Sequence, residues 1–258
     1  MTAPLGRRRV EISRRREAGA YVVLEAPDET APRAGQFYML AAAERWGGGE
    51  DERPFLPRAF SVMRARDGVL EFMLEDVGPG TRRLCELSPG DGLWLAGPFG
   101  RPFVPARDAR RPVLVGGGVG TAPLAILQDE LGAAALVLLG FRDASHAEGA
   151  TLLRDARVAT DDGSVGHHGY VTDLLRAELG CDARAEVYAC GPPLMLEAVR
   201  ALCEELGVPA QLALEAGMAC GFGACFGCVV PVRGGNYVRL CVDGPVLDAA
   251  DLEAVHAH

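Results

Sequence analysis

The stretch PVLVGGGVGTAPLAIL, residues 112–127, decides the fold of this chain. Its first residues are an apolar run typical of a buried strand, and an amphipathic helix is expected after the glycines. The free N–H groups at the start of such a helix suit a pyrophosphate. The glycines at 116, 117, 118 and 120 do not complete the G-x-G-x-x-G pattern, so this turn alone is not specific for a dinucleotide.

Downstream of this stretch, strand and helix patterns alternate. AALVLLGFR at 134–142 and AEVYACG at 185–191 are predicted strands, whereas VTDLLRAEL at 171–179 and PPLMLEAVRALCEELG at 192–207 are predicted helices. This alternation indicates a parallel sheet with helices on its faces. We therefore expect an α/β nucleotide-binding domain over residues 107–210.

Upstream, short runs rich in Val, Leu, Phe and Tyr are separated by Gly, Pro and Asp. They are AYVVLEA at 20–26, GQFYMLAA at 35–42, RAFSVMRA at 58–65, GVLEFMLEDV at 68–77 and DGLWLAGPF at 91–99. Such runs are typical of antiparallel strands. They predict an antiparallel β-barrel domain over residues 1–106.

Composition sets limits on function. The chain has 258 residues and a formal net charge of −9, which favours two or three compact units and argues against nucleic-acid binding. No run of apolar residues is long enough for a transmembrane helix, and the N-terminus lacks the apolar core of a secretory signal. We expect a cytoplasmic protein whose eight cysteines do not form disulfides.

Four of those cysteines gather near the C-terminus, in ACGFGACFGCV at 219–229 and in YVRLCV at 237–242. The spacing C-x4-C-x2-C followed by a distant cysteine is the plant-type ligand pattern of a 2Fe–2S cluster. Glycines allow the tight turns that bring the thiolates together. A zinc site and four unrelated thiols are the alternatives. The predicted ligands, in a small module over residues 211–258, are Cys220, Cys225, Cys228 and Cys241.

RAFSV at 58–62 resembles the R-x-x-S motif of the ferredoxin reductase superfamily, and VGPGTRRL at 77–84 resembles its second phosphate loop. The resemblance implies FAD, with the motif arginine on the pyrophosphate and the serine near the isoalloxazine ring. A forked guanidinium suits paired phosphate oxygens. The implied FAD residues are Arg58, Ala59, Phe60, Ser61, Met73, Leu74, Glu75, Gly80 and Thr81.

The glycine turn and YACGPPLM at 188–195 resemble the two nucleotide elements of the same superfamily. The implied nucleotide residues are Gly117, Gly118, Gly120, Thr121, Gly191 and Pro192. Cys190 is implied to lie where hydride crosses to the flavin, and a buried strand-end thiol is the alternative. Asp161 and Asp162 favour NAD over NADP, whereas Arg142 favours a 2′-phosphate.

The order of flavin, nucleotide and cluster parts resembles the electron-transfer subunits of type B dihydroorotate dehydrogenase. The motif E-x-x-M-x-C-G-x-G-x-C-x-G-C at 215–228 carries the resemblance most specifically. It implies an oxidoreductase subunit of pyrimidine biosynthesis, with electrons passing from FMN through the cluster and FAD to NAD⁺. It also implies a separate FMN-containing partner that converts dihydroorotate to orotate, in a two-plus-two heterotetramer.

The match has departures. Ala59 stands where the family often has proline, Arg82 where it often has lysine, and His167 and His168 where a basic residue is more usual. The segment 43–57 is longer than expected. Two alternatives stay open: the flavin subunit of an NAD(P)H-dependent ferredoxin oxidoreductase or sulfhydrogenase, and a non-catalytic redox or zinc sensor.

Overall fold

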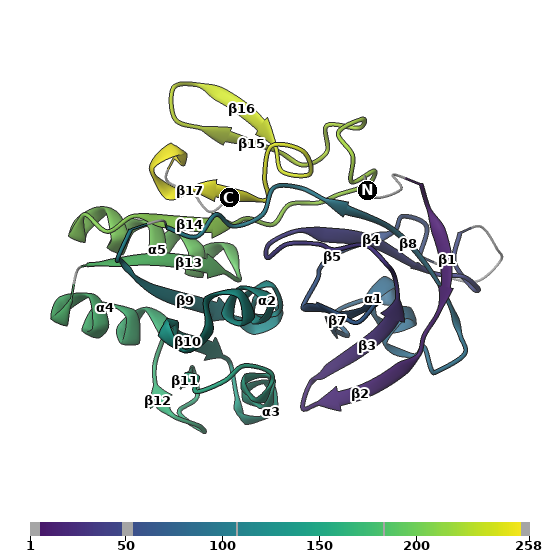
Figure 1. The fold of residues 1–258 in the computed structure, drawn as a ribbon, viewed down its shortest axis with the longest axis horizontal. Helices are drawn as coiled ribbons and strands as arrows, with labels where there is room; N and C mark the ends of the chain where they lie inside the picture. The colour runs from purple at the N-terminus through teal and green to yellow at the C-terminus, as the bar shows by residue number, and fades with distance from the viewer. Residues whose placement is uncertain (1–5, 48–53, 107, 183, 254–258) are drawn as a thin grey trace.

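The computed structural model describes residues 6–47, 54–106, 108–182 and 184–253. Three parts follow one another along the chain (Figure 1): antiparallel strands coloured purple to blue, a larger sheet flanked by teal and green helices, and a yellow C-terminal segment. The C-terminal segment lies along both of the other parts. This arrangement brings residues far apart in sequence to the junction between the two halves.

The N-terminal part contains two four-stranded antiparallel sheets. One has the order β1 (Arg8–Glu11), β8 (Gly92–Phe99), β4 (Phe37–Ala42), β5 (Arg58–Ser61), and the other the order β2 (Arg14–Ala18), β3 (Tyr21–Pro27), β7 (Val69–Glu75), β6 (Arg64–Arg66). The helix α1 (Pro79–Cys85) lies between β7 and β8 in sequence. The predicted antiparallel strands are confirmed. Pairing among the described residues forms two sheets, so closure into a barrel stays a prediction.

The second part is a seven-stranded sheet in which every pairing is parallel except the one at the β17 edge. Its order is β12 (His167–His168), β11 (Arg157–Thr160), β10 (Leu136–Phe141), β9 (Arg111–Gly117), β13 (Ala185–Cys190), β14 (Ala210–Ala213), β17 (Val246–Asp248). The connecting helices are α2 (Ala122–Leu131), α3 (Ala144–Ala147), α4 (Val171–Cys181) and α5 (Pro193–Leu206), with short 3-10 turns at 118–121, 132–134 and 148–152. The predicted α/β alternation is confirmed.

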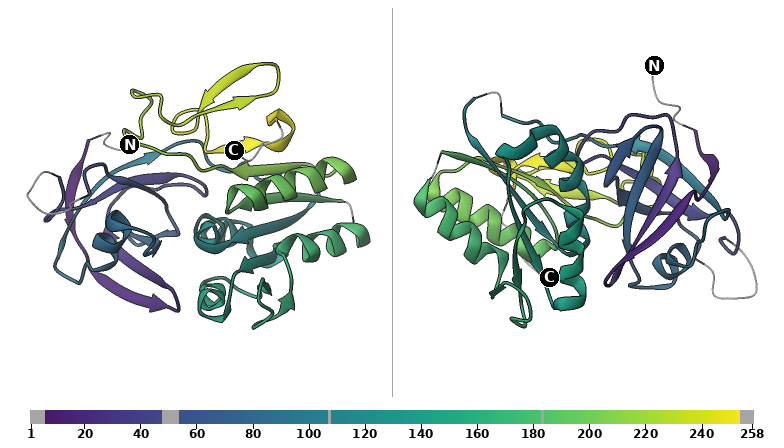
Figure 2. Two further views of the ribbon diagram at one scale, coloured as in Figure 1. Left: turned by 180° about the vertical axis from the view of Figure 1, so that it is seen from behind. Right: turned by 60° about the horizontal axis from the view of Figure 1, so that its bottom comes forward.

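Side chains of the central strands point alternately to two cores. Val113 and Val115 of β9 pack with the apolar side chains of α4 and α5, whereas Leu114 packs with α2 and with the N-terminal sheets. The green helices therefore cover one face of the sheet, and the teal helix α2 lies between the other face and the antiparallel strands (Figure 2). One continuous core, which includes Tyr21 and Phe72, joins the two halves.

The C-terminal segment is tied to both halves. After β14 it forms a hairpin, β15 (Val229–Val232) and β16 (Asn236–Arg239), and β17 returns to pair antiparallel with β14 before a 3-10 turn at 249–251. Its cysteine-bearing part packs on Phe37, Met39 and Phe99 of the first antiparallel sheet. The sheet thus extends past residue 210, and the division into three domains stays a prediction.

Among the described residues, no helix is both long enough and apolar enough to span a membrane.

Candidate functional site

A cavity of about 240 Å³ lies at the junction of the three parts. Its wall combines residues that the sequence assigned to separate cofactors: Arg58, Ala59, Phe60, Ser61, Met73, Thr81, Gly120 and Cys190. Residues 214–216 and Met218, which lead into the cysteine segment, complete the wall with Phe37 and Pro245. The fold therefore brings the predicted flavin residues, the nucleotide residues and the approach to the cysteines to one place.

Arg58 lies against the turn that begins α1. A Cβ atom at Gly80 would come within 2.6 Å of the Arg58 Nε, so only glycine leaves room for the guanidinium there. Arg58 Nη1 donates a hydrogen bond to the carbonyl of Leu56 at 2.6 Å. The Thr81 hydroxyl holds the turn, because it accepts a hydrogen bond from the Val77 N–H and donates one to the Gly78 carbonyl. This cradle fits the phosphate end of a dinucleotide such as FAD.

Four predicted cofactor residues, Leu74, Gly80, Thr121 and Gly191, line neither this cavity nor the larger one described below, and two of them are fully buried. Leu74 is fully buried in the core that joins the two halves. Thr121 is also fully buried, and its hydroxyl donates to the Met73 sulfur at 3.5 Å. These side chains contact protein rather than open space, so any contribution to a cofactor would come from their backbone.

A second cavity, of about 560 Å³, opens where β9, β10 and β13 end. Its wall includes Gly117, Gly118 and Pro192 from the two predicted nucleotide elements, together with Tyr21, Arg142 and Asp161. In parallel sheets of this kind, ligands bind outside the carboxyl ends of the strands. The cavity thus has the position and the glycine-rich wall that a dinucleotide needs.

The two nucleotide elements approach each other very closely. A Cβ atom at Gly120 would come within 2.5 Å of the Gly191 Cα and 2.6 Å of the Cys190 carbonyl oxygen. Side chains at these positions would push the two loops apart. Gly191 lines neither cavity, so its part in the site is this close approach.

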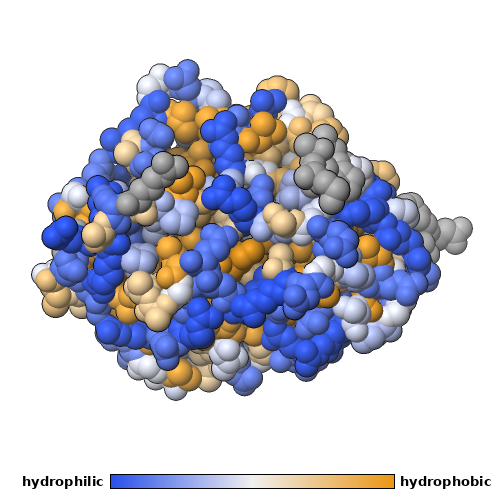
Figure 3. Space-filling model, in the orientation of Figure 1, coloured by the Kyte–Doolittle hydropathy of each residue, from blue (hydrophilic) through white to orange (hydrophobic). Residues whose placement is uncertain are grey.

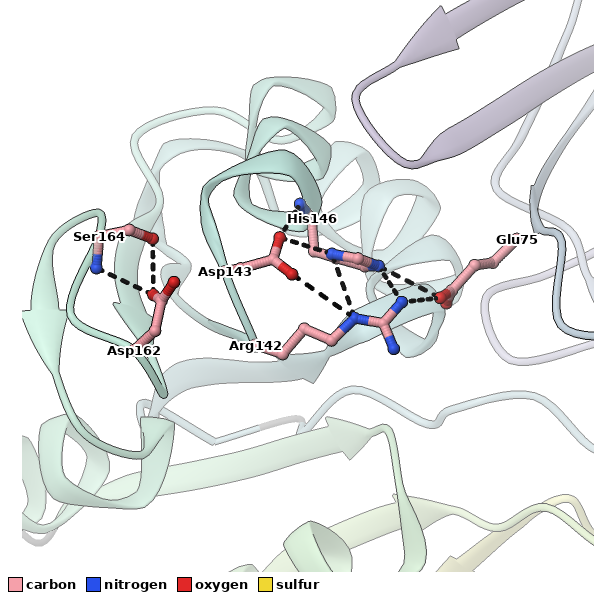
Figure 4. A network of polar contacts seen from close by, with 6 residues as sticks. All are labelled: Glu75, Arg142, Asp143, His146, Asp162 and Ser164. Carbon is pink, nitrogen blue, oxygen red and sulfur yellow. Dashed lines mark hydrogen bonds and ion pairs between the residues drawn. The ribbon is translucent and has the colours of Figure 1, made fainter.

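Glu75, Arg142, Asp143 and His146 form a network of polar contacts beside the larger cavity (Figure 4). Arg142 Nη2 lies 2.6 Å from Glu75 Oε1, and His146 Nε2 lies 3.2 Å from the same carboxylate oxygen. The other ring nitrogen of His146 lies 2.7 Å from Asp143 Oδ1. Asp162 instead bonds with Ser164, apart from this network.

Sequence reasoning missed Tyr21 and His146, and it treated Glu75 only as a flavin neighbour. His146 is nearly buried, and its ring meets the edge of the Tyr21 ring at 5.6 Å. No spacing pattern links these residues, because they come from β3, β7 and α3. Asp143 three residues before His146 was the available signal, since an aspartate at that position caps a helix.

Cys190 ends β13 and is buried beside the smaller cavity. Burial raises the pKa of its thiol well above the usual range, and the neighbouring Glu215 carboxylate adds to the rise. Desolvation by the surrounding protein also raises the pKa of Glu215, another wall residue that sequence reasoning did not assign. Cys190 therefore offers a neutral thiol to whatever occupies the cavity.

The four C-terminal cysteines form two pairs. Cys228 and Cys241 are buried, and their sulfur atoms are 3.2 Å apart. The Cys225 side chain lies close enough to Cys220 to help lower the pKa of its thiol. Gly221, at φ +80°, lies where the cysteine loop packs on the first antiparallel sheet. A Cβ atom there would come within 2.5 Å of Met39, so a side chain at this position would push the loop off the sheet.

Backbone donors surround the sulfur of Cys220. Burial raises the pKa of this thiol, but hydrogen bonds from the backbone N–H groups of Cys225, Phe222 and Ala224 act against it and leave the pKa at about 6. Burial and the adjacent Cys228 thiol raise the pKa of Cys241 to about 12. N–H groups that stabilise one thiolate suit the sulfurs of an anionic cluster.

The arrangement of the thiols fits a 2Fe–2S cluster, whose four cysteines serve two irons. Among the described residues, no three His, Cys, Asp or Glu side chains gather closely enough to hold one metal ion.

Hydrophobic side chains are exposed beside the cysteine pairs. Phe222 and Phe226 are each 62% exposed, and Cys225 is exposed between them. Hydrophobic surface is visible near the top of the molecule over the C-terminal segment (Figure 3). Exposed apolar groups of this kind mark interaction sites.

The C-terminal part of the chain matches a known domain family. Residues 215–253 match the model described as the iron–sulfur cluster binding domain of dihydroorotate dehydrogenase B.

Full-length relatives are also found. The chain is 35% identical over 239 residues to the dihydroorotate dehydrogenase B (NAD(+)), electron transfer subunit of Clostridium acetobutylicum, with 92% of each chain covered. It is 37% identical over 227 residues to the subunit of the same name from Caldanaerobacter subterraneus, covering 86% of this chain and 87% of that one.

Solved structures share the fold. A chain in the NADH-dependent reduced ferredoxin-NADP oxidoreductase structure superposes with a TM-score of 0.79 at 25% identity, over 95% of this chain and 90% of that chain. The ferredoxin reductase of carbazole 1,9a-dioxygenase superposes with a TM-score of 0.66 at 22% identity, over 81% of this chain and 67% of that chain. The second likeness concerns the fold alone.

Proposed function

This chain belongs to the family of electron-transfer subunits of dihydroorotate dehydrogenase B, and we propose that it links a catalytic partner to NAD⁺. The partner is an FMN-containing subunit that oxidises dihydroorotate to orotate. The chain itself is an oxidoreductase subunit. Its product is NADH, formed with electrons that the partner supplies.

Different residues of the chain bind FAD, NAD and the 2Fe–2S cluster. Arg58, Ser61 and the turn at Gly80 hold FAD, the loops at Gly117–Gly118 and Gly191–Pro192 hold NAD, and the two cysteine pairs hold a 2Fe–2S cluster. FAD, when bound, supplies chemistry that exchanges a hydride with NAD and single electrons with the cluster. Cys190 keeps its proton and packs beside the reacting groups, because burial opposes its ionisation.

The cavity of about 240 Å³ carries the proposal, because it joins the three sets of residues. Residues of β5 and β7 form one side, Cys190 and Gly120 form the nucleotide side, and residues 214–218 lead directly to Cys220. Most of the wall around these groups is apolar.

The exposed face around Cys225 is where the catalytic partner docks. Phe222 and Phe226 offer an apolar surface beside the cysteine pairs, and docking there brings the partner's flavin close to them. A two-plus-two assembly forms when two such pairs of subunits associate with each other. Electrons can then enter at this face and leave at the nucleotide cavity on the far side of the junction.

The test is to mix the purified holoprotein with the FMN-containing subunit and measure NAD⁺ reduction that depends on dihydroorotate. We expect turnover only when both subunits are present. Each subunit alone serves as the control. If the mixture stays inactive with NAD⁺ but the chain alone exchanges electrons with reduced ferredoxin, the chain would instead be a ferredoxin-linked oxidoreductase subunit.

A further inference from the structure

We propose that Glu75 sets the nucleotide preference of this chain, by holding Arg142 away from a 2′-phosphate. The proposal rests on the proposed function, since it concerns the same nucleotide cavity. It adds a residue from the flavin half of the molecule to the determinants of nucleotide choice.

Arg142 is placed where nucleotide choice is usually decided. It directly follows β10, the neighbour of β9 in the sheet, and it lines the cavity that begins at Gly117 and Gly118. In dinucleotide-binding folds, an acidic residue near this point bonds the adenosine ribose, whereas an arginine there accommodates the 2′-phosphate of NADP. This chain has both kinds of residue in succession, Arg142 and Asp143.

The structure shows how both of these side chains are engaged. The guanidinium of Arg142 contacts Glu75 at 2.6 Å, and its Nε lies 3.7 Å from Asp143 and beside the His146 ring. Asp143 accepts hydrogen bonds from the backbone N–H of His146 at 3.0 Å and from its ring at 2.7 Å. Asp143 therefore caps α3 and does not line the cavity, whereas Asp161 and Glu75 are the carboxylates at its wall among the described residues.

Glu75 is the fixed member of the pair. Its side chain is 17% exposed, that of His146 is 11% exposed and that of Arg142 is 61% exposed. The His146 ring is packed against Tyr21, so it supports the carboxylate of Glu75 from behind. Arg142 can leave this partner only by giving up a charge-assisted hydrogen bond.

This arrangement disfavours a 2′-phosphate for two reasons. Glu75, with a longer contact from Asp143, pairs with the one arginine at the cavity wall among the described residues, and Asp161 adds a negative charge to the same wall. An incoming 2′-phosphate must therefore compete with Glu75 for Arg142 and approach a carboxylate. NAD⁺ carries a ribose hydroxyl at that position, so its binding leaves the Glu75–Arg142 pair intact.

The test replaces Glu75 by glutamine and measures dissociation constants of the FAD-loaded holoprotein for NAD⁺, NADP⁺ and 2′,5′-ADP by calorimetry. For Glu75→Gln, affinity for NADP⁺ and 2′,5′-ADP should rise about fivefold to tenfold, which is the range for a charged hydrogen bond at a partly exposed site. Affinity for NAD⁺ should change less than about twofold, because its hydroxyl does not use Arg142. Adding Arg142→Gln should abolish the gain.

Glu71→Gln is the matched control. Glu71 lies on the same strand, its side chain is 18% exposed, and it pairs with Arg16 at 2.6 Å away from the cavity. This variant should leave all three dissociation constants unchanged. If Glu75→Gln does not fold, Glu75→Asp shortens the carboxylate and should shift the NADP⁺ constant in the same direction.

Two failures can be told apart. If the wild-type holoprotein binds neither nucleotide, the proposed function is wrong. If it binds NAD⁺ but the ratio of NAD⁺ to NADP⁺ affinity stays the same in Glu75→Gln and Glu75→Asp, the role of Glu75 is overturned while the proposed function stands.

Discussion

The cysteine loop and the network at the nucleotide cavity are assembled in opposite ways. Three of the four cysteines lie between residues 220 and 228, and the fourth follows in the turn after β16. The Glu75–Arg142 pair joins residues 67 positions apart, from β7 and from the end of β10. The first site is a property of one segment, and the second exists only because two halves of the fold meet.

The difference explains what each site tolerates. In the cysteine loop every sulfur has a fixed place in a short backbone, so the loss of one ligand cannot be replaced by a neighbour. Several side chains form the wall of the nucleotide cavity, so a change in one of them alters the affinity for the nucleotide without removing the site. Substitutions in the two regions should therefore differ in the size of their effects.

Cys225→Ser should produce the largest effect. Loss of a residue that supports a metal ligand lowers activity by up to about 100-fold, and loss of the ligand itself should lower it at least as much. Electron transfer to the catalytic subunit should therefore fall by at least about 100-fold. FAD binding and the reduction of that flavin by NADH should survive, because neither uses Cys225. Stopped-flow absorbance with and without the partner measures the two steps separately.

Cys181→Ser is the control for this substitution, since Cys181 is also exposed but lies at the end of α4. It should keep full transfer. If Cys225→Ser behaved like Cys181→Ser, the cysteine loop would not carry the electrons, and the contrast between the two regions would lose its basis.

Gly120→Ala tests the approach of the two nucleotide loops. The added methyl group would lie within 2.5 Å of the Gly191 Cα, and overpacking of this kind costs about 1–3 kcal/mol. The free energy of unfolding should fall by that amount, and the KM for NADH should rise. Chemical denaturation and steady-state kinetics of flavin reduction measure the two effects.

Gly180→Ala provides the comparison, because a Cβ atom at this exposed helix position meets nothing within 4 Å. It should leave the KM unchanged and keep or slightly raise stability. Equal losses in both glycine variants would show that the close approach of the loops does not matter.

The smallest effect concerns the ionic contacts between the halves. Burial raises the pKa of Asp129, but hydrogen bonds and charges from Arg154, Arg64 and Arg66 outweigh it and lower the pKa below its usual 3.8. A carboxyl group whose pKa is lower in the folded state stabilises the fold at pH values above its unfolded-state pKa. This stabilisation is lost as the pH falls through the folded-state pKa. The contribution should be below about 1 kcal/mol, because the site is partly exposed.

Asp129→Asn should therefore reduce the free energy of unfolding at pH 7 and flatten its decline below pH 4, as measured by urea denaturation at a series of pH values. Asp155→Asn serves as the control, since Asp155 has no ion pair among those found in the described residues. A pH profile of Asp129→Asn identical to that of the wild type would contradict the assignment.

Much of the fold could be predicted from local pattern. The apolar runs before Gly116 and Gly140 predicted buried parallel strands, and those strands are β9 and β10. The cysteine spacing predicted a site whose sulfurs pair in the structure. Both follow from residues that are neighbours in sequence or in one supersecondary unit.

Tertiary arrangement accounts for what the sequence could not predict. β14 precedes the cysteine segment in sequence and β17 follows it, and the two strands pair. The parallel-rich sheet therefore includes a strand from residues that were predicted to form a separate module. Thr121 follows the glycine turn but bonds to Met73 of the other half. The pairing of Arg142 with Glu75 could not be found either, because Glu75 reaches it only after the halves pack together.

An anaerobic absorption and EPR spectrum of the purified chain, recorded before and after NADH, tests directly whether the chain passes electrons between NADH, a flavin and a 2Fe–2S cluster. The account predicts flavin and 2Fe–2S absorption that bleaches on reduction, with a reduced-cluster EPR signal. A colourless, zinc-containing protein that ignores NADH, even after reconstitution with iron, sulfide and FAD, would contradict it.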